Sequence, residues 1–454
     1  MSSSPAPCCS IVDFGAVGDD RTLNTRAIQA ALDRVAELGG GVVLVPPGRF
    51  RTGMIRIRSN TVLELSPGSA IVGSPEMRDY EPVGTWVGGD RTPYHLLLIE
   101  DAHNVTLRGS GTIDGSGEAF WLPPNPPSPW YRHQNPNRPS PMIECVRCTN
   151  LRIEDVSIVN SPGWTVHLHD CDRVIVRGVV MRNHLFGPNT DGFDIKDCRD
   201  VLISDCSMEV GDDAIVLQSG KGGRGCERVA VTNCSLRSHC AALKCGQGDS
   251  FNRIRQVAFS NCVVHGSNRA FGLYCVNGAT YEDIVVSNIV ADTDTGFHLN
   301  RPIHIDLRRR DDNAPLGQIR NVLINNFVAR SEGRILLTAE DGAVLENVQL
   351  RNIHLTYPAI DDPEAWAPQS KSNQFSNRSP RARAARAAVV AENMRGFVLR
   401  DLTITWPNNP QNLPMHVLWA RNLEGGLIDV PLARPSRTDV EPFCLENCTA
   451  SVLR

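Results

Sequence analysis

The stretch Val201-Leu-Ile-Ser-Asp205-Cys206 carries the pattern that decides the fold of this chain. Its first and third residues are apolar, its fifth is Asp, and its sixth is apolar again. The same pattern recurs, and most neighbouring copies are about 23 to 28 residues apart, which is the range of solenoid repeats. The other copies are Leu151–Val156, Val174–Val179, Val229–Cys234, Val257–Cys262, Ile284–Ile289, Val322–Phe327, Val348–Ile353 and Phe397–Leu402.

Each copy predicts a β-strand that turns a corner. Alternating apolar residues are typical of a strand with one face on a core. The fifth residue is Asp, Asn or Gly, the types that tolerate a left-handed backbone at a tight bend. Stacked copies would place Cys206, Cys234 and Cys262 in one internal column as small apolar fillers. The sequence therefore predicts an all-β fold, a single-stranded right-handed parallel β-helix.

The N-terminal region reads differently from the repeats. Asn24–Leu32 has helical spacing, with Thr22 or Asn24 as a possible N-cap. We expect residues 10–50 to cover the open end of the solenoid, where unpaired strands invite aggregation.

Two stretches interrupt the repeat within the single domain that we expect over residues 1–454. Residues 117–142 are rich in Pro and aromatic side chains, and residues 358–392 are polar and rich in Arg. Both are predicted to be long loop insertions, which often border active sites when they are ordered. The alternative for each is a disordered excursion.

The charge balance argues against two classes of partner. Lys plus Arg number 46 and Asp plus Glu 50, so the net charge is −4, which favours neither a nucleic acid nor a membrane surface. No stretch reaches the ~18 consecutive apolar residues of a spanning helix. The first residues lack the basic end and apolar core of a signal peptide, so we expect a cytoplasmic protein. A removed leader would give the same appearance, and the oligomeric state is not indicated.

The 15 cysteines are expected to be buried thiols, because a long chain without a secretion signal rarely builds a disulfide framework. Cys145 and Cys148 form one CxxC motif, but no nearby residues complete a tetrahedral zinc site. We therefore expect neither a metal nor a cofactor.

Two acidic motifs lie in consecutive copies of the repeat. They are Asn189-Thr190-Asp191-Gly192-Phe193-Asp194-Ile195 and Gly211-Asp212-Asp213-Ala214-Ile215-Val216-Leu217. Aligning their inward residues puts Asp191 beside Asp213, and Thr190 beside Asp212. Neighbouring coils lie ~4.8 Å apart, so three carboxylates are predicted to crowd one small surface.

Crowded carboxylates favour one kind of chemistry. Stacked like charges cost stability and raise at least one pKa. A glycosidase needs that arrangement, because it uses one protonated carboxyl and one ionised carboxylate across the bond that it cuts. The alternatives are acids that merely form turns and a calcium site.

These residues resemble glycoside hydrolase family 28, the polygalacturonase family within the pectin-lyase-like β-helices. The two acidic motifs, at this separation, carry the specific part of the resemblance. The other matching stretches are Asp13–Asp19, Asn24-Thr25, Gly39–Pro46, Gly109–Gly115 and Arg138-Pro139.

The resemblance implies roles for the acids. Asp212 would be the general acid that protonates the leaving oxygen. Asp191 and Asp213 would hold and activate water on the opposite face, which inverts the anomeric centre without a covalent intermediate. Asn189, in the first motif, is expected to contact substrate.

The resemblance weakens where the family carries Gly-His-Gly. The segment here is Ser238–Gly246. Aligning on the histidine selects His239, whereas aligning the inward residues selects Cys240. The strand register favours Cys240, because a one-residue slip would turn Lys244 into the core. His239 is expected to act at the site from the bend, or to be an ordinary polar turn residue.

The family's Arg-x-Lys, which binds the sugar carboxylate, is absent. The corresponding coil reads Arg269–Cys275, with Gly272 and Tyr274 at the two basic positions. We expect Lys244 to project beside Gly272, fill the vacated space and meet a substrate carboxylate or hydroxyl; the alternative is a solvated lysine. Arg269 and Tyr274 are further candidates for binding substrate.

The sequence thus predicts an inverting hydrolase of pectin-type oligosaccharides, derived from galacturonate or rhamnogalacturonan. Trp121, in the aromatic loop, is expected to bind substrate, and that loop would close one end of the groove and enforce exo action. The alternatives are a lyase or epimerase of the pectate-lyase kind and a non-catalytic glycan-binding β-helix. Fold alone does not rank them.

Overall fold

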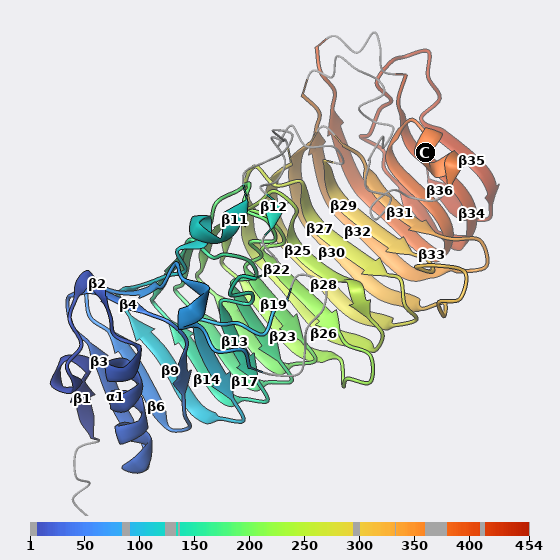
Figure 1. The fold of residues 1–454 in the computed structure, drawn as a ribbon. Helices are drawn as coiled ribbons and strands as arrows, with labels where there is room; N and C mark the ends of the chain where they lie inside the picture. The colour runs from blue at the N-terminus through green and yellow to red at the C-terminus, as the bar shows by residue number, and fades with distance from the viewer. Residues whose placement is uncertain are drawn as a thin grey trace, which may run out of the picture. The chain divides into compact units, whose positions relative to one another are not determined.

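The computed structural model describes residues 7–83, 91–122, 133–134, 137–293, 300–331, 333–358, 379–408 and 414–453. The chain divides into two compact units, Met1–Ile215 and Val216–Arg454. Each unit is built of parallel β-strands stacked coil upon coil, as the repeat predicts (Figure 1).

The described part of the first unit contains one long helix and three single-turn 3₁₀ helices beside its strands. The helices are η1 (Ile11–Phe14), α1 (Thr25–Glu37), η2 (Met77–Asp79) and η3 (Gly117–Phe120). The strands are β1 (Cys8–Ser10), β2 (Asp19–Leu23), β3 (Gly41–Val45), β4 (Gly48–Thr52), β5 (Ile55–Ile57), β6 (Thr61–Leu65), β7 (Ser69–Gly73), β8 (Leu97–Glu100), β9 (His103–Gly109), β10 (Thr112–Asp114), β11 (Trp121–Leu122), β12 (His133–Gln134), β13 (Ile143–Val146), β14 (Thr149–Glu154), β15 (Ser157–Val159), β16 (Val166–His169), β17 (Asp172–Arg177), β18 (Val180–Arg182), β19 (Phe193–Lys196), β20 (Arg199–Ser204) and β21 (Ser207–Val210).

Among its described residues, the second unit consists of longer strands and one short helix, α2 (Pro380–Ala384). Its strands are β22 (Ile215–Ser219), which begins at the last residue of the first unit, β23 (Cys226–Thr232), β24 (Ser235–Ser238), β25 (Ala241–Ser250), β26 (Arg253–Val264), β27 (Arg269–Cys275), β28 (Thr280–Thr293), β29 (Arg301–Leu307), β30 (Gln318–Ser331), β31 (Ile335–Ala339), β32 (Leu345–Thr356), β33 (Ala387–Thr405), β34 (His416–Asp429), β35 (Phe443–Cys448) and β36 (Ser451–Leu453).

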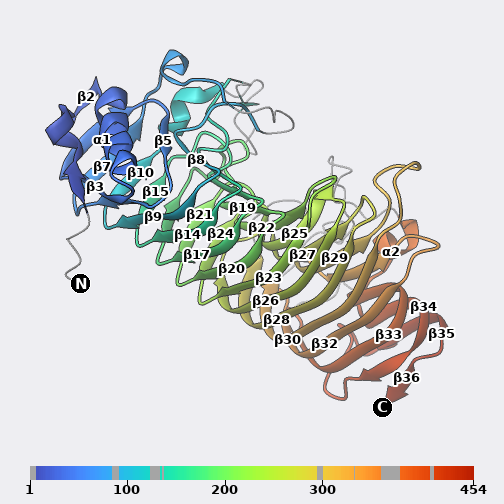
Figure 2. The same cartoon turned by 90° about the horizontal axis from the view of Figure 1, so that it is seen from below.

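Strands of successive coils pair in parallel, which builds a separate sheet along each face of a unit. In the first unit the three ladders are β5-β8-β13-β16-β19, β3-β6-β9-β14-β17-β20 and β4-β7-β10-β15-β18-β21. In the second unit the ladders β25-β27-β29-β31-β33 and β23-β26-β28-β30-β32 repeat the arrangement (Figure 2). The predicted parallel β-helix is confirmed.

The inward side chains form the core of each coil. Val166 of β16 lies level with Phe193 of β19, and Leu168 with Ile195; all four are fully buried. Alternate residues of the same strands face the other side of the sheet. This alternation sets the register of every neighbouring turn, including the acidic ones.

The bends follow the chemistry of the fifth residue of each repeat. All nine of these residues have φ between +50° and +67°, the left-handed region that Asp, Asn and Gly adopt at low cost. They are Asp155, Gly178, Asp205, Asn233, Asn261, Asn288, Asn326, Asn352 and Asp401.

All 15 cysteines are free thiols. In the second unit, Cys234 and Cys262 lie level on successive coils, because Val263 N–H donates to the Cys234 carbonyl at 2.9 Å. Cys206 is buried in the first unit. These side chains act as core fillers, as expected of buried thiols.

Helix α1 lies at the N-terminal end of the first unit and packs against β3 and β5. Its inner face buries Ile28, Ala31, Leu32 and Val35. Asn24 is the N-cap residue, but its side chain does not cap the helix. It accepts a hydrogen bond from Val17 N–H at 2.7 Å and so anchors the preceding loop to the start of the helix.

The two predicted loops are only partly regular. Within 117–142 the structure contains η3, β11 and β12, and residues 123–132 and 135–136 lie outside the described chain. Within 358–392, residues 359–378 lie outside it, and α2 and the start of β33 follow. The predicted C-terminal boundary of the second loop is therefore wrong, because β33 already begins at Ala387. No helix among the described residues is long and apolar enough to cross a membrane.

Candidate active site

The two acidic motifs form consecutive turns of the first unit. Gly192 N–H donates to the Asp213 carbonyl at 2.8 Å, and Phe193 N–H donates to the Ala214 carbonyl at 2.9 Å. In this parallel register Asp191 lies level with Asp213, and Thr190 with Asp212. The pairing predicted from the inward residues is confirmed.

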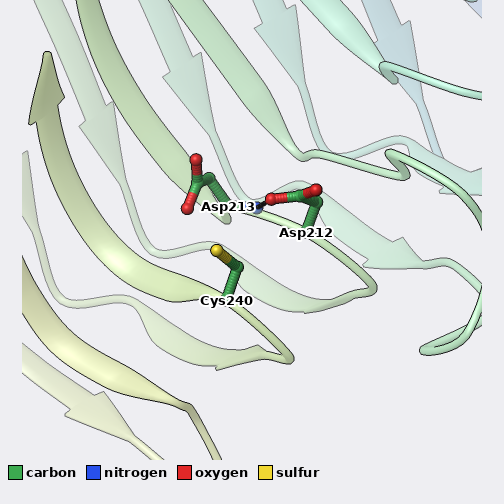
Figure 3. Close-up of side chains that lie close together, drawn as sticks. All are labelled: Asp212, Asp213 and Cys240. Carbon is green, nitrogen blue, oxygen red and sulfur yellow. Dashed lines mark hydrogen bonds between the residues drawn. The ribbon is translucent and has the colours of Figure 1, made fainter. Parts of the chain in front are cut away.

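The three carboxylates differ in their environment. Asp191 and Asp213 are 5% and 4% exposed, whereas Asp212 is only half-buried. Carboxylate oxygens of Asp212 and Asp213 lie within 4.8 Å of each other. Figure 3 shows both side chains on one turn, where Asp213 N–H donates to Asp212 Oδ1 at 2.9 Å. Neighbouring carboxylates disfavour simultaneous ionisation, which suits proton transfer.

Two aspartates from one turn supply few ligands for a metal. Calcium takes six to eight oxygen ligands, and magnesium demands six in octahedral geometry. Asp212 and Asp213 by themselves complete neither coordination sphere.

Thr190 joins the two acidic turns to each other. Its hydroxyl donates to the His184 carbonyl at 3.1 Å and accepts a hydrogen bond from Gly211 N–H at 3.0 Å. Thr190 has no exposed surface. The hydroxyl therefore fixes the start of the Asp212-Asp213 turn to the turn that carries Asp191.

Glycines allow the close approach of these turns. A Cβ atom on Gly211 would lie 2.5 Å from Thr190 Oγ1 and 2.8 Å from the His184 carbonyl oxygen. A Cβ atom on Gly192 would lie 2.2 Å from Met208 Cε and 2.3 Å from the Ala214 carbonyl oxygen. Any side chain at either position would push the acids apart.

Asn189 contacts the protein in this structure. It adopts φ +52°, and its Oδ1 accepts a hydrogen bond from Arg138 Nη2 at 3.4 Å. Arg138 is 1% exposed and also donates to the Pro188 carbonyl at 3.0 Å. Arg138 thus supports the turn before Asp191, a role that its place in the Arg138-Pro139 motif signalled only indirectly. Contact of Asn189 with substrate stays a prediction.

Trp121 also supports this turn. It is 8% exposed, and its Nε1–H donates to the Pro162 carbonyl at 3.0 Å. Its ring packs edge-on to His184, with ring centroids 5.6 Å apart. A Cβ atom on Gly187 would lie 2.8 Å from the ring, so the indole packs closely against the 184–190 turn. Its contact with substrate stays a prediction.

Sequence reasoning missed a polar ladder on the same unit. Glu144, His167 and Asp194 lie level on β13, β16 and β19, and His167 Nδ1 lies 3.0 Å from Glu144 Oε1. Burial raises the pKa of Glu144 to about 7. Burial, and then the charge of His167, lower the pKa of His169 to about 3. The sequence does contain a signal for this ladder, since each of its polar residues lies between two inward apolar residues of the same strand.

The remaining predicted residues lie in the second unit. His239 is 8% exposed and precedes β25. Lys244, 5% exposed, lies level with Gly272 as predicted. However, a Cβ atom on Gly272 would lie 2.6 Å from Tyr274 Cε2. The Tyr274 ring therefore lies over Gly272, and the expectation that Lys244 occupies the space beside it stays a prediction.

Arg269 holds the bend that contains Cys240. Its Nη2 donates to Cys240 Sγ at 2.7 Å, and its backbone N–H donates to the Cys240 carbonyl at 3.0 Å. These bonds agree with the strand register, which favours Cys240 over His239 at the position of the family's histidine. A catalytic role for His239 and substrate contacts of Arg269, Lys244 and Tyr274 stay predictions.

Comparison with known families gives a direct match. Residues 87–374 match the model described as Glycosyl hydrolases family 28, which is more than half of the chain. Residues 8–70 match the model described as Rhamnogalacturonase A/epimerase, pectate lyase-like.

Named relatives agree with this match. A probable polygalacturonase of Vitis vinifera is 29% identical over 229 residues, which cover 48% of this chain and 45% of that protein. A polygalacturonase of Persea americana is 29% identical over 223 residues, covering 48% and 45%. The chain thus matches less than half the length of these relatives.

Solved structures support the fold over a larger share of the chain. The hyperthermoactive exopolygalacturonase of Thermotoga maritima is 26% identical, with a TM-score of 0.67 over 78% of this chain and 88% of that one. The family 28 exopolygalacturonase of Yersinia enterocolitica gives a TM-score of 0.70 over 96% and 80%, at 17% identity. The family match, the paired acidic turns and the β-helix lead to one conclusion: the chain belongs to family 28 of the glycosyl hydrolases.

Proposed function

We propose that the protein is an inverting glycoside hydrolase that cleaves pectin-type oligosaccharides built from galacturonate or rhamnogalacturonan. One observation carries this proposal. Backbone hydrogen bonds hold Asp191 level with Asp213 on successive coils, with Asp212 beside them and more exposed. The family match and the polygalacturonase relatives support the choice of substrate class.

Asp212 would act as the general acid. Its carboxyl donates a proton to the glycosidic oxygen while the bond from that oxygen to the anomeric carbon breaks. Asp212 is the most exposed of the three acids, so it can reach the leaving group at the surface of the coil.

Asp191 and Asp213 would hold the attacking water and take its proton. The oxygen of this water forms the new bond to the anomeric carbon on the face opposite the leaving group, so the configuration inverts in one displacement. The buried position of both residues orients them and limits competing solvent. Exo action is part of the proposal, with the aromatic segment around Trp121 closing one end of the groove.

The test is a set of acid-to-amide substitutions. Asp212→Asn and Asp191→Asn should each lower kcat on oligogalacturonides by about 10³-fold or more, because general acid–base groups contribute about 10² to 10⁴ each. The matched control is Asp205→Asn, an exposed bend residue with φ +57°. Asparagine occupies the same place in other copies, so this variant should keep full activity.

The same variants separate the rival functions. A glycan-binding protein would show no turnover in any form, and Asp212→Asn would bind oligosaccharide like the parent. A lyase would release an unsaturated product that absorbs in the ultraviolet. Release of a single saturated sugar from the chain end would support exo action, and a ladder of oligomers from the first turnover would contradict it.

A further inference from the structure

One aromatic side chain of the first unit is exposed beside the acidic turns. Phe186 is 37% exposed, whereas every other Phe, Trp and Tyr among the described residues is buried or half-buried. A phenyl ring left in water forgoes the stabilisation that its burial would give. The position of this ring relative to the acids decides whether it can meet substrate.

The turn that carries Phe186 lies against the start of the Asp212 turn. A Cβ atom on Gly211 would lie 2.8 Å from the His184 carbonyl oxygen and 2.9 Å from the Gly187 carbonyl oxygen. Residues 184 and 187 flank Phe186, and Gly211 directly precedes Asp212. Phe186 therefore projects from a backbone segment that packs against the turn of the proposed general acid.

His184 links Phe186 to Trp121 in a row of three rings. The Phe186 and His184 ring centroids lie 6.1 Å apart at an interplanar angle of 61°. Those of His184 and Trp121 lie 5.6 Å apart at 71°. Both contacts are edge-on, an arrangement that aromatic rings favour. We call Trp121, His184 and Phe186 the aromatic row.

A hydrogen bond keeps the middle ring of the row neutral. Phe186 N–H donates to His184 Nδ1 at 3.0 Å, so this nitrogen is an acceptor. An imidazole whose Nδ1 accepts carries its single proton on Nε2 and has no charge. The phenyl and indole rings do not ionise at all, so the aromatic row consists of three uncharged rings.

Contacts beneath the row fix its position. The Trp121 indole is 8% exposed and donates its Nε1–H to the Pro162 carbonyl at 3.0 Å. The His184 carbonyl accepts the Thr190 hydroxyl at 3.1 Å. A ring that is held in place before a ligand arrives loses little conformational freedom on binding. Phe186 is thus supported from below and open to solvent above.

We infer that Phe186 is a sugar-stacking residue of the active site, which packs its ring against the apolar C–H face of a pyranose next to the bond that is cut. His184 and Trp121 support it from behind. A pyranose carries several C–H bonds on one face, and an aromatic ring matches that face with a large flat apolar surface at low cost in conformational entropy. The inference rests on the proposed function for the place of that bond beside Asp212.

The chemistry of the aromatic row sets which sugars Phe186 can hold. A uronate and its methyl ester share the C–H face of the ring and differ only at C6. The row carries no charge, so its contact does not require a carboxylate. Phe186 should therefore contribute equally to the binding of acidic pectic fragments and of esterified ones.

The first experiment measures binding without turnover. In an Asp212→Asn background, calorimetry with a galacturonate trimer should show about tenfold weaker binding for Phe186→Ala. Phe186→Tyr keeps the ring and should restore affinity to within threefold. The matched control Leu202→Ala removes a 40% exposed apolar side chain on β20 and should not change affinity.

Two outcomes of this experiment overturn the inference. Equal affinity in Phe186→Ala would show that the ring does not meet the sugar. Full affinity in Phe186→Leu, which keeps apolar bulk but has no ring, would show that stacking is not the contact.

The second experiment tests whether the contact is uncharged. The ratio of the dissociation constants of Phe186→Ala and the unsubstituted protein should stay near tenfold for the trimer and for its methyl ester. It should also stay near tenfold at low and at high salt, because salt screens charges and not stacking. A ratio that falls to one with the ester or at high salt would overturn the inference.

The third experiment separates a substrate contact from a structural role. With Asp212 intact, Phe186→Ala should raise KM about tenfold and change kcat less than threefold. Its melting temperature should stay within about 2 °C of the parent's, because the side chain is exposed. A lower melting temperature with reduced kcat at an unchanged KM would make Phe186 structural and overturn the inference.

Failure of the proposed function has a different signature. It would appear as unchanged hydrolysis in Asp212→Asn, or as no hydrolysis in the parent. Either result can occur while calorimetry still shows that Phe186 contributes to binding of the trimer.

Discussion

Replacing Thr190 by valine tests whether the two acidic turns are coupled through one hydroxyl. Valine keeps the shape of threonine but removes the oxygen that donates to the His184 carbonyl and accepts from Gly211 N–H. Gly211 directly precedes the two acids of the second motif. The substitution should therefore misplace Asp212 and Asp213 relative to Asp191.

The size of the effect follows from the burial of this contact. A buried N–H without a partner costs about 1 to 3 kcal/mol, and Thr190 is fully buried. For a unit the size of Met1–Ile215, one kcal/mol corresponds to roughly 2 to 4 °C of melting temperature, so we expect a fall of roughly 2 to 12 °C. A misplacement of about 1 Å at a catalytic group can cost about 100-fold in rate. We expect kcat to fall by about 10- to 100-fold.

The assay compares kcat and KM of the parent, Thr190→Val and Thr190→Ser on one oligogalacturonide, together with melting temperatures. The serine variant keeps the hydroxyl and loses only a methyl group, so it should retain most of kcat. KM should change little in either variant, because Thr190 is buried and is not proposed to touch substrate. Equal kcat in the valine and parent proteins would refute the coupling, as would an equal loss in the serine variant.

Three further predictions concern other residues. Burial raises the pKa of Glu144 from 4.5 to about 7, so the folded state binds the proton of this carboxyl more tightly than the unfolded state does. The free energy of unfolding should therefore fall by about 3 kcal/mol as pH rises from 4.5 to 7. Glu144→Gln should flatten that fall in denaturation curves; a curve unchanged by the substitution would contradict the assignment. Gly192→Ala would place its Cβ 2.3 Å from the Ala214 carbonyl oxygen. It should lower the free energy of unfolding by about 1 to 3 kcal/mol and remove most of the activity. Full activity at an unchanged melting temperature would show that the two turns can move apart without harm, which would contradict this prediction. Lys244→Ala should raise KM for acidic oligosaccharides about tenfold with a smaller change in kcat, and unchanged kinetics on the best substrate would end its proposed role.

The parts that the sequence predicts well depend on single residues and their neighbours. An Asp, Asn or Gly at the fifth position of each repeat is enough to specify a left-handed bend, and every such bend is present. Alternation within Phe193–Ile195 likewise determines which side chains face inward. The pairing of Asp191 with Asp213 follows from that alternation alone.

Other features depend on contacts between coils that a repeat pattern does not encode. The Tyr274 ring lies over Gly272 because of its side-chain rotamer, which the register does not specify. The outward polar residues Glu144 and His167 look like solvated strand residues in the sequence, although both are buried.

Proton NMR of the first product from a defined pectic oligosaccharide tests the central claim most directly. If water held by Asp191 and Asp213 attacks opposite the leaving group, the earliest spectra, before mutarotation, will show the anomer of opposite configuration to the bond that was cut. A first product of unchanged configuration, or one that carries a double bond, would contradict the account.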